Sequence, residues 1–281
     1  MSSGRADRSS DPSNPQATRS VELDRFCVTG GPPRRERVNV VEETFLSVWI
    51  EEVGRYVLVC TPSDMEALAI GFAFSEGLIA SMDDVLDLGR RADDPEAVTL
   101  KIRDPSREAP GRNLLITSSC GVCGARNIEA FLAGEIQVPR TLAIPALRLP
   151  EIVGEMRTRQ DLFARTGGTH AAAVFRPDGQ IASFAEDIGR HSALDKAIGK
   201  CLISGTSPRG CGAAFSGRAS FEIVAKAARA GIELIAAVSA PSSLALDVAE
   251  ACGITLCAFV REDRASAYTH AARIRQEAEL K

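Results

Sequence analysis

Apolar and polar positions alternate in short runs over the first third of the chain and predict a strand-rich lobe. The runs TFLSVWI (residues 44–50) and RYVLVC (55–60) predict two strands on either side of the turn EEVG. DVLDLGR (84–90) and AVTLKIR (97–103) predict two more. We therefore expect an N-terminal α+β lobe over residues 21–112.

One segment between these strands changes from a period of two to the helical period. Ser63 and Glu66 have the spacing of a capping box, and Gly77 stands where a helix is expected to stop. Between them, apolar side chains recur at helical spacing at Met65, Leu68, Ala69, Phe72 and Ala73. The lobe is therefore predicted to contain at least one helix.

The rest of the chain alternates strands with helices, which indicates an α/β domain over residues 113–281. Strands are predicted at NLLIT (113–117), HAAAVF (170–175), IASFAED (181–187), GAAF (212–215), IELIAAV (232–238) and ITLCAFV (254–260), and helices at 150–166, 191–202, 221–231 and 244–253. Strands that alternate with helices favour parallel pairing through right-handed crossovers.

The composition is typical of a globular protein. Hydrophobic residues make up 45% of the 281 residues and charged residues 25%, with a formal net charge of −4. This charge gives no attraction to nucleic acid or anionic lipid, and no run approaches the roughly 18 apolar residues of a membrane span. Residues 1–20, rich in Ser, Pro, Asp and Arg, are predicted as a disordered tail without a secretory signal. We therefore expect a cytoplasmic protein.

Three loops of the second domain are predicted to gather at one edge of the sheet. They are Ser216–Ser220, Ser239–Ser243 and Arg261–Arg264, and each follows a predicted strand. Ligands bind beyond the carboxyl ends of parallel strands, and helix starts and arginines suit phosphate. Serines at helix starts also act as simple N-caps. Taken together, the three loops favour a pocket for a phosphorylated ligand.

The stretch SSCGVCG (118–124) holds a pair of cysteines, Cys120 and Cys123, that allows three interpretations. A structural zinc site needs four ligands, and the chain has no second CxxC and only three histidines. A thioredoxin-like disulfide would sit at a helix start. The surrounding glycines and serines instead favour a mobile loop with a carrier thiol, whose pKa Arg112 and Arg126 would lower.

A charged corner follows the predicted strand 181–187. In EDIGRHSALDKAIG, Asp187 and His191 are candidates for a proton shuttle or for ligand contacts. The alternative is that Asp187 caps the next helix and His191 is half-buried. His170, after two glycines, is equally open to a binding or a structural role.

These motifs, taken in order, resemble the formate dehydrogenase accessory sulfurtransferase family of the FdhD/NarQ type. The resemblance runs from about residue 36 to residue 272. It depends on the segments FAFSEGLI, SSCGVCG, TGGTHAAAVF, EDIGRHSALDKAIG, SGRAS, AGIELIAAVSAPSSLA and GITLCAFVREDRASAYT.

The resemblance implies a homodimeric sulfur carrier. Its second domain would be a three-layer domain like that of cytidine deaminases. It would receive sulfur from a cysteine desulfurase as a persulfide on Cys120, with Cys123 assisting. It would pass the sulfur to the molybdenum (or tungsten) bis-guanine-dinucleotide cofactor of formate dehydrogenase.

The expected cofactor contacts combine the family's F-x-R-x-x-R run with the edge and the charged corner inferred above. The acids Glu262 and Asp263 interrupt the run, where neutral residues are expected beside phosphate. The full set is Phe259, Val260, Arg261, Glu262, Asp263, Arg264, Ser216, Gly217, Arg218, Ser239, His191 and Asp187.

Two other functions compete with this one. A non-catalytic chaperone would bind and deliver the cofactor without using its cysteines. A zinc-binding regulatory protein would purify with stoichiometric zinc. The sequence does not contain the zinc deaminase signature, because no H-x-E precedes the CxxC.

Overall fold

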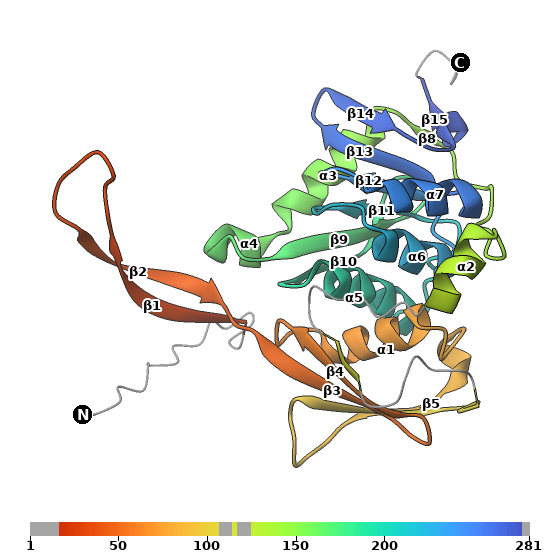
Figure 1. Cartoon of the computed structure of the whole chain (residues 1–281), viewed down its shortest axis with the longest axis horizontal. Helices are drawn as coiled ribbons and strands as arrows, with labels where there is room; N and C mark the ends of the chain where they lie inside the picture. The colour runs from red at the N-terminus through yellow and green to blue at the C-terminus, as the bar shows by residue number, and fades with distance from the viewer. Residues whose placement is uncertain (1–16, 107–113, 117–124, 277–281) are drawn as a thin grey trace.

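The computed structural model describes residues 17–106, 114–116 and 125–276. Two mixed α/β parts lie one above the other, and a long two-stranded arm projects from one side (Figure 1). The arm is formed by β1 (Thr18–Arg25) and β2 (Arg34–Val41), which pair antiparallel along their whole length. Within the described residues, no helix is long and apolar enough to cross a membrane.

The smaller part is a five-stranded sheet with helix α1 (Met65–Ser75) packed on one face. Its strand order is β5-β6-β3-β4-β7. The strands are β3 (Thr44–Ile50), β4 (Gly54–Cys60), β5 (Val85–Arg90), β6 (Ala97–Ile102) and β7 (Leu114–Ile116), with a 3-10 turn at Met82–Asp84. This arrangement confirms the predicted strands and the helix between them.

The larger part is a six-stranded sheet in the order β10-β9-β11-β12-β13-β14. Its strands are β9 (His170–Phe175), β10 (Ile181–Asp187), β11 (Gly212–Phe215), β12 (Leu234–Ala237), β13 (Thr255–Arg261) and β14 (Arg264–Ala267). The strands β11, β12 and β13 are parallel, as their alternation with helices predicts, and the others are antiparallel to their neighbours.

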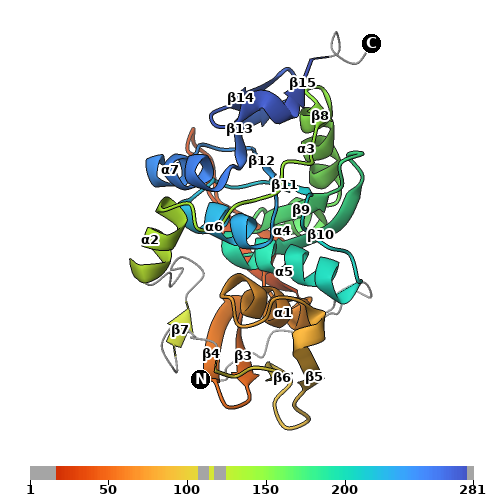
Figure 2. The ribbon, with the colours of Figure 1, turned by 90° about the vertical axis from the view of Figure 1, so that its right-hand side faces the viewer.

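Helices cover both faces of this sheet, so the part has three layers (Figure 2). On β9, Ala171, Ala173 and Phe175 face α3, whereas Ala172 and Val174 face the opposite layer. Both faces are buried, which is why these strands are almost wholly apolar. The helices are α2 (Ala125–Leu132), α3 (Arg148–Thr158), α4 (Asp161–Thr166), α5 (Arg190–Ile203), α6 (Phe221–Arg229) and α7 (Ser243–Cys252); a 3-10 turn (Ala271–Arg273) and the short pair β8 (Ile144–Pro145) and β15 (Ile274–Arg275) complete the part.

Several predicted boundaries are wrong. The predicted tail over residues 1–20 extends too far, because Thr18 already starts β1; residues 1–16 lie outside the described residues. The boundary after residue 112 is also too early, because β7 pairs with β4 and so belongs to the smaller sheet. The arm, α2 and β14 were not expected.

Two details of the predicted helices also differ. The capping box fails because the N-cap of α1 is Asp64, in the left-handed region and without a side-chain cap; Glu66 instead pairs with Arg90 on β5. The helix expected at 150–166 is broken into α3 and α4 at Gln160, which has a non-helical ψ of 68°. Its predicted end at Gly167 is confirmed, since Gly167 has a φ of 67°.

The two parts meet where α1 lies against α5 (Figure 2), and each helix has a glycine at the contact. A Cβ atom on Gly71 of α1 would overlap the carbonyl oxygen of Asp195, and one on Gly199 of α5 would overlap that of Ala67. The two helix backbones are therefore in direct contact. Because α1 also packs against the small sheet, it is buried on nearly all sides and has no polar face.

A buried polar network crosses the same contact. Ser75 Oγ donates to Asp195 Oδ1 at 2.6 Å, and Lys226 Nζ of α6 pairs with Asp195 Oδ2 at 2.8 Å. Glu76 lies 3.6 Å from the same amine. Burial raises the pKa of Glu76, while Lys226 lowers it. Apolar packing does not depend on direction, whereas hydrogen bonds and ion pairs do. The network therefore links α1, α5 and α6 through directional contacts.

We predict that Gly199→Ala lowers the free energy of unfolding by about 1–3 kcal/mol or more, because the methyl group must push two helices apart. Gly154→Ala on α3 is the matched control, since no atom lies within 4 Å of a Cβ there. It should stabilise the protein by about 0.5–1 kcal/mol. Urea unfolding followed by circular dichroism measures both. Equal effects of the two substitutions would show that α1 and α5 are not in backbone contact.

Candidate functional site

The three predicted loops do meet at the carboxyl edge of β11, β12 and β13. Ala219 N donates to Ala240 O at 3.1 Å, and Ser242 N donates to Ala219 O at 3.0 Å. Phe259 N donates to Ser239 O at 3.4 Å. Backbone hydrogen bonds thus tie the first loop to the second, and the second to Phe259, which lies two residues before the third loop.

The loop after β11 combines a structural serine with an exposed arginine. Ser216 Oγ accepts a hydrogen bond from Ala171 N at 2.8 Å, which fastens the loop to β9. At Gly217 a Cβ would lie 3.3 Å from His170 Nδ1, so the glycine lets the imidazole lie close to the backbone. Arg218 is exposed. Of this loop, Arg218 is therefore best placed to meet a ligand.

The serines at the starts of the next two helices behave differently. Ser242 caps α7 by accepting a hydrogen bond from Ala245 N at 3.3 Å, which is the simple capping role. Ser220 precedes α6 but makes no such bond, although its hydroxyl is buried. Ser239 is half-buried and contributes its carbonyl to the loop contact.

The run from Phe259 to Arg264 forms the end of β13 and the start of β14. Phe259 lies at an irregularity of the ladder with a φ of 52°, and the residue is 39% exposed. A positive φ is unfavourable for a bulky side chain, so the surrounding ladder must hold it. Val260 is completely buried, so its side chain packs in the core and does not reach a ligand.

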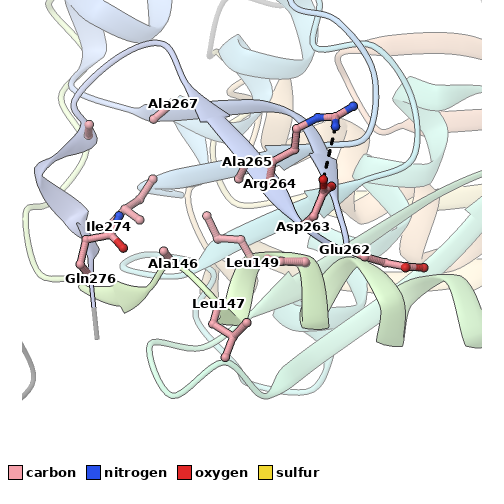
Figure 3. Close-up of a pocket in the computed structure, with 12 residues that line it drawn as sticks. Ala146, Leu147, Leu149, Glu262, Asp263, Arg264, Ala265, Ala267, Ile274 and Gln276 are labelled. Carbon is pink, nitrogen blue, oxygen red and sulfur yellow. Dashed lines mark hydrogen bonds and ion pairs between the residues drawn. The ribbon is translucent and has the colours of Figure 1, made fainter. Parts of the chain in front are cut away.

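The charged residues of this run point in different directions. Arg261 turns back to the sheet edge, where Nη1 donates to Val238 O at 2.6 Å and to Val260 O at 2.9 Å. Arg264 is exposed and lies 3.5 Å from Asp263. Glu262, Asp263 and Arg264 line a surface cavity between β14 and the start of α3 (Figure 3), which has a volume of about 570 Å³. Its two acids do not favour phosphate, so we place the anion contacts at the carboxyl edge.

Asp187 is fully buried and its oxygens are occupied. Lys196 Nζ lies 2.6 Å from Oδ2, Thr61 N donates to Oδ2 at 3.0 Å, and Gly189 N donates to Oδ1 at 2.7 Å. Burial raises the pKa of Asp187, and Lys196 opposes that shift. The carboxylate therefore joins β4 of the small part to the corner of the large one. The expectation of a proton shuttle is corrected to this anchoring role.

His191 is also committed to the fold. Its Nε2 lies 2.6 Å from Glu222 Oε2, which joins the first turn of α5 to that of α6, and only 8% of the residue is exposed. The half-buried structural interpretation therefore fits His191 better than direct ligand contact. Sequence reasoning gave less weight to His170 and none to Arg190, which lie at the same edge. Their signal was a nearby glycine: Gly168 lies two residues before His170 at the start of β9, and Gly189 directly precedes Arg190 at the start of α5.

Burial separates the cysteines by reactivity. Among the described residues, Cys60, Cys201, Cys211, Cys252 and Cys257 are buried free thiols, and Cys27 is exposed. Burial raises the pKa of Cys60 and Cys257 to about 12 and of Cys211 and Cys252 to about 11, so these thiols are poor nucleophiles. Cys252 and Cys257 are core residues, as predicted.

The two cysteines of the CxxC pair lie outside the described residues. Their assignment as persulfide carrier and assistant stays a prediction, as does the lowering of their pKa by Arg112 and Arg126. Across the part of the chain that the structure describes, no three His, Cys, Asp or Glu side chains gather as a metal site.

Comparisons with known proteins agree with one another. Residues 41–275 match the model of the FdhD/NarQ family. The sulfur carrier protein FdhD of Mycobacterium tuberculosis (strain H37Rv) is 43% identical over 262 residues, covering 85% of this chain and 92% of the relative. That of Thermoplasma volcanium is 42% identical over 234 residues, covering 80% and 83%.

A solved structure shares the fold. The crystal structure of a protein from Desulfotalea psychrophila, assigned as a formate dehydrogenase accessory protein, superposes with a TM-score of 0.74. It is 21% identical, and the match covers 91% of this chain and 99% of that one. The likeness shows that the arrangement of both parts is shared.

We predict that Lys196→Met lowers the free energy of unfolding by about 3–5 kcal/mol, because it leaves Asp187 charged and buried without its partner. The double variant Asp187→Asn/Lys196→Met should recover part of this loss. Arg25→Gln, which breaks the exposed pair with Glu36, is the control and should cost less than about 1 kcal/mol. Chemical denaturation of the three variants measures the difference. A loss in Lys196→Met no larger than in the control would contradict the anchoring role.

Proposed function

Because the chain belongs to the FdhD/NarQ family, we propose that it is a sulfur carrier for the maturation of formate dehydrogenase. It receives sulfur from a cysteine desulfurase as a persulfide on Cys120. It then transfers this sulfur to a molybdenum (or tungsten) bis-guanine-dinucleotide cofactor, which it binds as its substrate. The proposal includes a cytidine-deaminase-like fold for the second domain and a homodimer.

The observation that carries this proposal is the family match, which spans residues 41–275 and includes the CxxC pair. The distribution of thiols supports it. Five of the described cysteines are buried, with their pKa values raised by burial. A sulfur carrier needs an accessible thiolate, so these five are poorly suited to the reaction.

The loading step needs no oxidant. The thiolate of Cys120 attacks the outer sulfur of the desulfurase persulfide. A new S–S bond forms as the old one breaks, and the desulfurase cysteine leaves as a thiolate. The outer sulfur keeps its oxidation state, so the step is an exchange.

The carboxyl edge supports binding of a multiply anionic substrate. Arg218 is exposed there and Arg261 is half-buried. Forked guanidinium groups bind phosphate oxygens in pairs. The buried contacts of Asp187 and His191 hold this edge in place. Weak sites of this kind, spread along several strand ends, suit an extended dinucleotide better than a compact ion.

We predict that incubation with a desulfurase and cysteine adds one sulfur atom to the protein. Mass spectrometry of the intact chain and of its peptides should place it on Cys120. The adduct should persist in Cys123→Ala and disappear in Cys120→Ala. Cys27→Ala is the control, because Cys27 is exposed and a hydrogen bond from Thr29 lowers its pKa. Sulfur on neither cysteine of the pair would sink the proposal.

Formate dehydrogenase activity distinguishes a carrier from a delivery chaperone. A Cys120→Ala/Cys123→Ala variant should fail to support active enzyme if the protein carries sulfur. Full activity with this variant would instead establish the non-catalytic chaperone.

A further inference from the structure

Four polar residues that the family run does not include lie on segments that meet at one part of the carboxyl edge. His170 begins β9, Arg190 begins α5, and Arg218 and Ser220 lie in the loop between β11 and α6. Pairing of His170 with Asp187, and of Phe215 with Ala172, brings these segments to the same edge. Gly217 lies against the His170 ring, so the loop and β9 are in contact.

The carboxylates around this point are already occupied. Asp187 pairs with Lys196, and Glu222 pairs with His191. Glu186 accepts hydrogen bonds from Leu162 N, Phe163 N and Thr169 Oγ1 at 2.7–3.0 Å. No ion pair to Arg190 or Arg218 occurs among the described residues, so no described carboxylate occupies either guanidinium group at this point.

The neighbouring charged groups act on the imidazole of His170. Burial lowers the pKa of His170 from its ordinary value of 6.5, and Arg190, His191 and Arg218 lower it further. Asp187 opposes them. Positive groups that repel one another in the folded protein are stabilised when an anion binds between them.

Two buried donors at the same point have no partner. Within the described part of the chain, Arg190 Nε and Ser220 Oγ are buried atoms without a hydrogen bond. A buried donor left unpaired destabilises the fold, and each case calls for an explanation. An oxygen-rich anion would accept bonds from both. It would also lie near the first turns of α5 and α6, whose N–H groups favour negative charge.

We propose that His170, Arg190, Arg218 and Ser220 form a subsite for a diphosphate group. Two guanidinium groups, an imidazole and a hydroxyl offer more donors than one phosphate needs. The subsite is separate from Phe259–Arg264, because β9 and β13 are three strands apart in the sheet, about 14 Å at ordinary strand spacing. Resting on the proposed function, the group bound here is a diphosphate of the guanine dinucleotide.

Isothermal titration with inorganic pyrophosphate tests the subsite directly. Arg190→Gln and Arg218→Gln should each weaken binding about tenfold, the usual effect of losing a charge-assisted contact. Arg157→Gln removes one charge from an exposed position on α3 and should leave the affinity unchanged. Absence of pyrophosphate binding, or equal affinity in all four proteins, would overturn the proposal.

The pH dependence gives a second readout. An anion favours the imidazolium form, so bound pyrophosphate raises the pKa of His170, and binding takes up a proton. Affinity of the wild type relative to His170→Asn should therefore rise as pH falls from about 8 to about 6. Protonation of pyrophosphate itself is common to both proteins and cancels. The groups that face His170 are Arg190 and His191 from α5, Asp187 from β10 and Arg218 from the loop. A constant ratio would remove His170 from the subsite.

Sulfur loading separates this proposal from the function it rests on. Sulfur loading of Cys120 is therefore measured on the wild type beside pyrophosphate binding. If pyrophosphate binds as predicted but no cysteine accepts sulfur, the subsite stands and the sulfur carrier function fails. If sulfur loads but pyrophosphate does not bind, the subsite fails alone.

Discussion

The contact between α1 and α5 is the constraint on which the rest of the structure depends. Gly71 and Gly199 let the two helix backbones touch. Because α1 covers the small sheet and α5 covers β9 and β10 of the large one, this contact fixes the two sheets relative to each other. Larger side chains at these positions would push the two helices apart. The end of β4 would then move away from Asp187 at the corner of the large sheet.

The edge where a ligand is proposed to bind is held by buried charges that do not reach it. Thr61, at the end of the small sheet, donates its N–H to Asp187. Its hydroxyl accepts a hydrogen bond from Ile188 N at 3.0 Å, and its carbonyl accepts one from Lys196 at 3.0 Å. His191 and Glu222 join the starts of α5 and α6. In these contacts Asp187 is paired with Lys196, and Glu222 with His191. Within the described residues, Arg190 and Arg218 have no carboxylate partner, so their guanidinium groups are available to an anion.

Much of the fold could be predicted from local pattern. The strands 44–50 and 170–175 are apolar because they are buried, and Gly167 ends a helix because it adopts a positive φ. Prediction failed where tertiary contacts overrode the local signal. The arm is held by antiparallel pairing and by cross-strand pairs such as Arg25 with Glu36, so its strands show little apolar alternation. Glu66 fits a capping box in sequence, yet it lies beside Arg90, which comes from β5.

The sequence alone determined the alternation of strands and helices, the gathering of three loops at one sheet edge and the family of the chain, because these follow from periodicity and from motifs in fixed order. Only the tertiary structure decided which of the charged residues face outward. Asp187, His191 and Val260 were equal candidates with Arg218 in sequence, but burial and ion pairing commit the first three to the fold. His170 and Arg190, 20 residues apart in the chain, come to the same edge through the pairing of β9 with β10. Charge compensation depends on distances in space, and a linear sequence does not contain them.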